Sequence, residues 1–171
     1  WQEPQRQFLV AALQGNTEAC TALLDEYTHT PDDIEAFYEH VIQAAMYEIG
    51  LLWERSEISV AEEHLASAIV TRVMANTNAR LSRSPSSEKK VVVTAAPNEY
   101  HEIGAWMIAD VLAQDGWNVL YLGANTPQAD LLRMLYEHKP LLLAVSVTMP
   151  YNLVYLKALH EFTPSYHEAS N

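Results

Sequence analysis

The chain has 171 residues, of which 49% are hydrophobic and 19% charged, a composition typical of a folded protein and not of a disordered tail. Its 10 basic and 22 acidic side chains give a formal net charge of −12, which disfavours direct binding of this segment to nucleic acid or to an anionic membrane surface. The single cysteine, Cys20, excludes an intrachain disulfide and zinc sites built on several cysteines. No apolar run reaches the roughly 20 residues that span a bilayer, and Trp1–Pro4 does not resemble the start of a signal peptide, so we expect a cytoplasmic protein.

The first half of the chain is predicted to be entirely helical. Apolar residues recur at helical spacing from Gln5 to Leu81, with no strand-like alternation. Thr30 is the expected N-cap of the third helix, and the sequence Ser59-Val60-Ala61-Glu62 predicts a capping box at the start of the fourth. Four helices joined by short connections predict a bundle over residues 1–81. The expected helices are Pro4–Gln14, Thr17–Tyr27, Pro31–Gly50 and Ser59–Leu81.

The second half has a different pattern, beginning after a polar stretch. Residues 82–90, rich in serine, are predicted to be an exposed linker. The β-branched run that follows is typical of a strand buried on both faces of a parallel sheet. The order of elements over residues 91–171 predicts a doubly wound, Rossmann-like or flavodoxin-like α/β domain. The expected strands are Val91–Ala95, Asn118–Leu122 and Leu141–Val147, and the expected helices are Glu102–Asp115, Thr126–His138 and Tyr151–Phe162.

Three loops of this α/β domain should share the rim at the carboxyl ends of the strands, where such sheets bind ligands. In the first loop, Glu99 stands two residues before His101 and can accept its Nδ1 proton, which leaves Nε2 free to bind a metal. Gly104 removes a side chain where a planar ligand would approach. One histidine cannot hold a free divalent ion, but it could bind a metal already held in a macrocycle. The alternative is a solvated His101, with Glu99 as a helix cap and Gly104 needed for packing. The three loops are Ala96–His101, Gly123–Thr126 and Ser146–Asn152.

The segment Glu99-x-His101-x-x-Gly104 resembles the Asp-x-His-x-x-Gly motif of cobalamin-binding domains, with Glu in place of Asp. The resemblance implies that His101 binds cobalt from below, in place of the cofactor's own dimethylbenzimidazole, whose nucleotide tail enters the sheet. Ser146 and Thr148 match the family's Ser-x-Thr at the third strand, whose hydroxyls would contact that tail. Without the resemblance, these two residues would be read as a strand-end turn. A helical bundle before the α/β domain is also the family's arrangement.

The bundle carries a narrower motif: Trp53, then nine residues, then Glu63 and His64. We expect the loop Leu52–Ile58 to bring Trp53 beside the pair. Taken singly, these residues would be a core aromatic, a helix N-terminal acid and an exposed polar side chain. Their spacing resembles the Trp-x₉-Glu-His signature of CarH-type adenosylcobalamin photoreceptors, which implies that Trp53 covers the upper face of the cofactor. Glu63 and His64 would then contact the adenosyl group.

Two departures from this family stand out. Some of its members place a histidine directly after the Trp as a second cobalt ligand, where this chain has Glu54. The family's α/β domain has five strands and a Gly-Gly turn, whereas three strands are predicted here, so we expect the chain to be an incomplete fragment.

The function that we expect is a sensory module rather than an enzyme. Photolysis of bound adenosylcobalamin would rearrange the bundle and signal to another copy of the chain or to an output domain. The main alternative is a corrinoid subunit that carries a methyl group, as methylcobalamin, between methyltransferases. A third possibility is a flavodoxin-like interaction domain that binds no cofactor.

Overall fold

The computed structural model describes residues 1–78 and 88–162. The chain forms two compact units, Trp1–Ser82 and Arg83–Asn171, which are taken in turn below. Most of the predicted linker and the whole segment from Thr163 onward lie outside the described residues. No helix in the described part of the chain is both long enough and apolar enough to cross a membrane.

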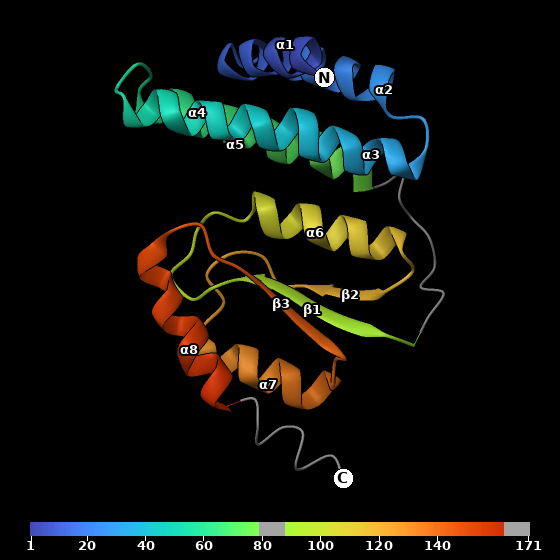
Figure 1. The fold of residues 1–171 in the computed structure, drawn as a ribbon, viewed down its shortest axis with the longest axis vertical. Helices are drawn as coiled ribbons and strands as arrows, with labels where there is room; N and C mark the ends of the chain where they lie inside the picture. Colours follow the sequence, from blue (N-terminus) through green and yellow to red (C-terminus); the bar gives the residue numbers. More distant parts are fainter. Residues whose placement is uncertain (79–87, 163–171) are drawn as a thin grey trace. The chain divides into compact units, whose positions relative to one another are not determined.

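The first unit is a helical bundle (Figure 1). The side chain of Asn16 caps the second helix by accepting a hydrogen bond from the Ala19 amide at 3.0 Å. Thr30 begins the next helix as predicted, in a capping box that Asp33 completes. The expected third helix is one continuous run with a π-helical segment in its middle. The elements are α1 Gln2–Leu13, α2 Thr17–Tyr27, α3 Pro31–Phe37, π-helix Tyr38–Gln43, α4 Ala44–Glu54 and α5 Val60–Asn78.

The end of α4 corrects the prediction that this helix stops at Gly50. The helix continues to Glu54 because a glycine does not end a helix unless the backbone turns left-handed there. That turn comes at Ser56, whose φ is +59°. Its amide donates to the Trp53 carbonyl, and the Glu57 amide donates to the Leu52 carbonyl, which together form a Schellman motif. Trp53 is therefore a helical residue and not part of a loop.

The bundle core is built from large apolar side chains that the helical spacing placed on one face of each helix. Phe8 and Phe37 are fully buried and meet edge to face, with ring centroids 5.9 Å apart. Cys20 is also fully buried, and this burial raises the pKa of its thiol to about 11. Cys20 is thus a protonated core residue at neutral pH.

The second unit is a parallel three-stranded sheet with helices on both faces, which confirms the predicted α/β architecture (Figure 1). The strand order is β2-β1-β3, so β1 is central. The helix α6 covers one face, and α7 and α8 cover the other. The elements are β1 Lys90–Ala95, α6 Ile103–Gln114, β2 Asn118–Tyr121, α7 Gln128–His138, β3 Leu142–Ser146, the 3₁₀ turn Pro150–Asn152, and α8 Leu153–Phe162.

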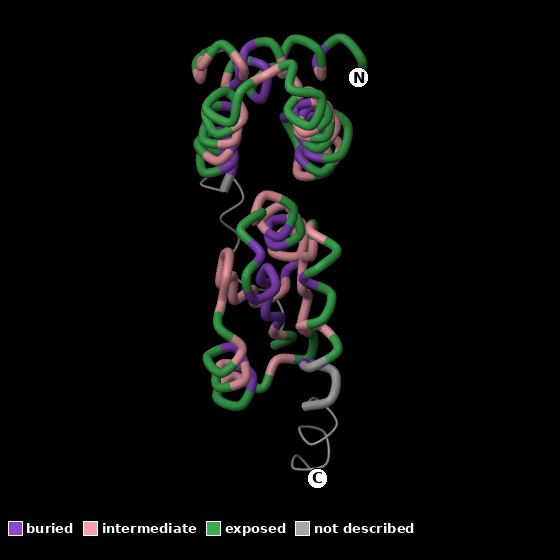
Figure 2. Tube along the Cα trace, turned by 90° about the vertical axis from the view of Figure 1, so that its left-hand side faces the viewer, coloured by how far each residue is buried: buried purple, intermediate pink, exposed green. Residues whose placement is uncertain are grey.

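The core of this unit lies on both sides of β1, as the β-branched run predicted. Val91 and Val93 pack with Ala105 and Ala109 of α6, while Val92 packs on the opposite face. The partners of Val92 are Leu131, Leu135 and Leu159, from α7 and α8. Figure 2 shows the buried residues of each unit within its own core.

Two helices of this unit start two residues later than predicted. The helix α7 begins at Gln128, with Pro127 at the N-cap position, and not at Thr126. Thr126 stays outside the helix because its hydroxyl contacts the buried hydroxyl of Thr94, at a distance of 3.1 Å. The last predicted helix is divided, because the 3₁₀ turn at Pro150–Asn152 precedes α8.

The three loops at the carboxyl ends of the strands do share one rim. The Ala95 amide donates to the Gly123 carbonyl at 3.0 Å, and the Ala96 amide donates to the Ser146 carbonyl at 3.0 Å. The loop after β1 is therefore held between the loops after β2 and β3.

Candidate functional site

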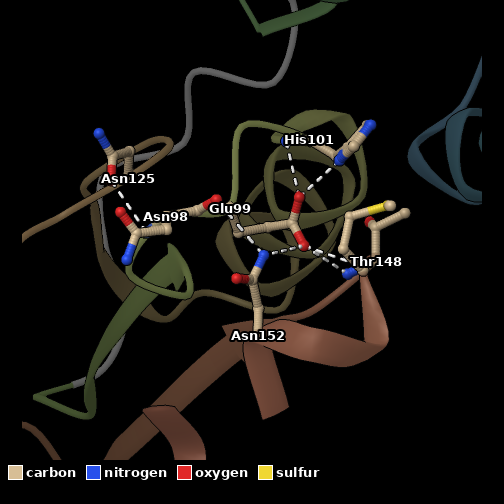
Figure 3. Close-up of polar contacts among 7 residues, drawn as sticks. Asn98, Glu99, His101, Asn125, Thr148 and Asn152 are labelled. Atoms are coloured by element: carbon tan, nitrogen blue, oxygen red, sulfur yellow. Dashed lines mark hydrogen bonds and ion pairs between the residues drawn. The ribbon is translucent and has the colours of Figure 1, made fainter. Parts of the chain in front are cut away.

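A buried carboxylate lies at the centre of this rim. Glu99, in the loop after β1, has no exposed surface. Its Oε2 accepts hydrogen bonds from the backbone amides of Thr148 at 3.0 Å and Met149 at 2.8 Å, and from Asn152 Nδ2 at 3.1 Å (Figure 3). All three donors come from the segment after β3. Glu99 thus joins the ends of the two neighbouring strands.

These hydrogen bonds keep Glu99 ionised. Burial is the largest single influence on the pKa of Glu99 and acts to raise it. Hydrogen bonds from Met149, His101 and Asn152 together outweigh burial and bring this pKa to about 2. At neutral pH Glu99 is therefore a carboxylate that can only accept hydrogen bonds.

The carboxylate fixes the proton on the neighbouring imidazole. Oε1 of Glu99 lies 2.5 Å from Nδ1 of His101 and accepts a second hydrogen bond from the His101 backbone amide at 3.2 Å. Because Glu99 has no proton to give, Nδ1 of His101 must be the donor. In the neutral ring, Nε2 then carries a lone pair, and the side chain is 58% exposed at the rim. His101 is thus oriented to bind an approaching electrophile or metal.

Beside this pair, small residues line the α6 side of β3. A Cβ added to Gly104 would lie 3.6 Å from Ser146 Oγ, so the two positions face each other. Thr148 is exposed, and the hydrogen bond that it makes to Glu99 comes from its backbone amide. The family resemblance implied that the hydroxyls of Ser146 and Thr148 contact the cofactor's tail, and the structure adds a backbone role for Thr148 in holding Glu99.

The bundle carries the remaining predicted residues at one end of the α4–α5 hairpin. Trp53 lies in the last turn of α4 and is 50% exposed. Glu63 and His64 lie in the first turn of α5, beyond the turn at residues 55–59. Glu63 accepts a hydrogen bond from Ser67 Oγ at 2.8 Å, and its other oxygen lies 3.6 Å from Nε2 of His64. Glu54 is the last residue of α4 and directly follows Trp53.

Sequence reasoning missed the asparagines around His101. Asn152 is almost fully buried and binds Glu99, while Asn98 and Asn125 connect two of the rim loops. The only sequence signal for them was their position after a strand end, which is equally typical of an exposed turn. Their roles depend on partners from other loops.

The donor set fits a metal that brings its own equatorial ligands. Within residues 1–78 and 88–162, no three side chains of the types His, Cys, Asp and Glu gather into a group that could hold a metal ion. His101 offers one nitrogen donor with a carboxylate behind it, and Gly104 and the hydroxyl of Ser146 face each other nearby. These residues suit a metal macrocycle with an attached tail.

Comparison with known proteins gives three results. Two family models, each described as a B12 binding domain, match residues 4–77 and 89–169. The HTH-type transcriptional repressors CarA and CarH of Myxococcus xanthus are 31% and 30% identical over 80% and 81% of this chain. These matches cover 44% and 46% of the repressors, so the chain spans less than half the length of the curated relatives it matches. The Methanosarcina barkeri monomethylamine corrinoid protein shares the fold, with a TM-score of 0.80 over 96% of this chain and 79% of that one at 17% identity.

Proposed function

Because this chain belongs to the family of B12-binding domain proteins, we propose that it is the light-sensing module of a cobalamin-dependent regulator. Cobalamin binding follows from the family. The form of the cofactor and the response to light are the proposed part. The repressors CarA and CarH, at about 30% identity, support a regulatory role over an enzymatic one.

In the α/β unit, His101 would hold the cofactor. Bound adenosylcobalamin supplies a corrin-held cobalt and a cobalt–carbon bond that light can break. Nε2 of His101 would bind the cobalt, and Glu99 keeps the proton on Nδ1 so that this lone pair stays available. Gly104 leaves room for the nucleotide tail, and Ser146 and Thr148 offer it hydroxyl groups.

In the bundle, the α4–α5 hairpin would contact the adenosyl group. The observation that carries this proposal is that Trp53 and the Glu63–His64 pair occur at the same end of one hairpin. The half-exposed indole of Trp53 offers an apolar surface for a nucleoside. Glu63 and His64 offer hydrogen-bond partners for its sugar and base. A methyl group is too small to use such a set of contacts, so these residues favour adenosylcobalamin over methylcobalamin.

The proposed signal is a change in how the bundle binds the cofactor. If Trp53, Glu63 and His64 contact the adenosyl group, the bundle would lose these contacts together when that group is absent, and its population of conformations would shift. Since the net charge of this segment is −12, any DNA-directed output belongs to a fused output domain or to a partner. The simplest partner that could respond to such a shift of the bundle is a second copy of the chain.

The test is an absorption spectrum of the chain with adenosylcobalamin in the dark and after green light. We expect a His-on, base-off spectrum in the dark that light changes irreversibly, together with a change in sedimentation. The Trp53→Ala variant should bind adenosylcobalamin and methylcobalamin equally, whereas the parent chain should prefer adenosylcobalamin. Equal affinities in the parent chain, with no light-dependent sedimentation change, would favour the methyl-carrier alternative.

A further inference from the structure

One asparagine of the β2–α7 loop contacts three consecutive residues just before His101. Asn125 Oδ1 accepts a hydrogen bond from the Asn98 amide at 2.9 Å. The Asn125 amide donates to the Glu99 carbonyl at 2.9 Å, and Asn125 Nδ2 donates to the Tyr100 hydroxyl at 3.3 Å. The segment that leads to the cobalt ligand is thus held by one residue from the neighbouring loop (Figure 3).

Both asparagines adopt a backbone conformation that most residues avoid. The φ angle is +61° at Asn98 and +52° at Asn125. Asparagine tolerates this left-handed region better than other residues with side chains, and glycine tolerates it without steric cost. A glycine at position 125 would keep the backbone shape and lose both side-chain contacts. The position therefore separates the effect of backbone shape from the effect of hydrogen bonding.

The opposite side of the same segment is held by the chain after β3. Asn98 Nδ2 donates to the Tyr155 hydroxyl of α8 at 2.5 Å, and the Asn98 carbonyl accepts from Asn152 Nδ2 at 3.3 Å. The peptide groups before His101 are consequently fixed from both neighbouring strand ends. Since His101 itself is more than half exposed, its direction depends on this backbone.

We propose that Asn125 is a positioning residue for cobalamin, which fixes the loop of Asn98, Glu99 and Tyr100 so that His101 is already in its cobalt-binding orientation before the cofactor arrives. Preorganisation of this kind lowers the ordering cost of binding. The proposal rests on cobalamin binding and not on light sensing. Asn125 acts through the loop and needs no contact with the cofactor.

The experiment compares three variants of the full chain with methylcobalamin as the probe, in the dark. Asn125→Gly loses two hydrogen bonds worth roughly fivefold each, so its Kd for methylcobalamin should rise by up to about 25-fold. Asn125→Asp keeps an acceptor for the Asn98 amide and should stay within about threefold of the parent chain. Lys139→Gly replaces another left-handed residue, at the C-cap of α7 (φ +45°), and should bind as the parent does.

A cofactor-free readout accompanies the affinities. In the apo chain, amide hydrogen exchange of Asn98 should be about tenfold faster in Asn125→Gly than in the parent, and near the parent rate in Asn125→Asp. The Asn125→Gly complex should also show a smaller His-on fraction in its absorption spectrum. Parent-like affinity and exchange in Asn125→Gly would overturn the proposal. Equal losses of methylcobalamin affinity in Asn125→Gly and Asn125→Asp would also overturn it, because a hydrogen-bonding role requires that the acceptor kept in Asn125→Asp restores binding. A failed light response leaves these dark measurements unaffected.

Discussion

Replacing Glu99 with glutamine changes one oxygen to an amide nitrogen at a site where every neighbouring group is a donor. If the new NH₂ faces the segment after β3, the amides of Thr148 and Met149 and the side chain of Asn152 all lose their acceptor. If it faces His101 instead, only the His101 amide loses its acceptor. The second orientation is the less costly one. It makes His101 Nδ1 an acceptor, which places the ring proton on Nε2.

The size of the effect follows from these contacts. A buried donor left without a partner costs about 1–3 kcal/mol, and the three remaining bonds lose the strength that the charge of Glu99 gave them. We therefore expect Glu99→Gln to lower the free energy of unfolding of the α/β unit by about 2–4 kcal/mol. With the proton on Nε2, His101 has no lone pair for cobalt, and cobalamin affinity should fall by about 10- to 100-fold.

Urea unfolding of the apo chain and absorption titration with methylcobalamin measure the two effects separately. Glu137→Gln, an exposed substitution on α7 with the same change in charge, is the matched control and should alter neither quantity. A Glu99→Gln chain that unfolds within about 0.5 kcal/mol of the parent, or that binds cobalamin with His101 still on cobalt, would refute the reasoning about proton placement.

Three further predictions concern other parts of the chain. Gly104→Val should weaken methylcobalamin binding in a titration while changing the melting temperature little, because the added atoms point toward Ser146 across the proposed tail space. A binding loss that is matched by an equal loss of folding free energy in a thermal melt would contradict this. Trp53→Ala should lower the free energy of unfolding in urea by less than about 1 kcal/mol, since the indole is half exposed. A larger decrease would assign Trp53 to the core. Hydrogen bonds from the backbone and hydroxyl of Ser59 lower the pKa of Glu62, so the ionised Glu62 stabilises α5 at neutral pH. This contribution is lost as the pH falls through the lowered pKa, below the usual range of a glutamate. Glu62→Gln should therefore lose less helicity than the parent between pH 6 and pH 3 in circular dichroism, and an unchanged acid response would refute this.

The sequence alone determined the features that depend on neighbours along the chain. Helical spacing and the caps at Thr30 and Ser59 fixed where helices begin, because a cap needs only residues within one turn. The β-branched run at Val91–Val93 identified a strand covered on both faces, since only such a strand is apolar at successive positions. The spacing of Glu99 and His101 predicted their hydrogen bond, which spans two residues.

Tertiary structure decided what depends on residues far apart in the sequence. Glu99 stays ionised while buried because donors from Thr148, Met149 and Asn152, 49 to 53 positions away, add to those of the neighbouring His101, and no local pattern predicts these distant donors. The link between Asn98 and Asn125 spans 27 positions and exists only because parallel strands bring their carboxyl ends to one rim. The end of α4 at Glu54 is a different case, because the left-handed turn at Ser56 that ends the helix is local, but a serine is not a residue that signals such a turn in the sequence. Local patterns specify elements and ligand types, whereas the electrostatics and orientation of a ligand are set by the groups that folding gathers around it.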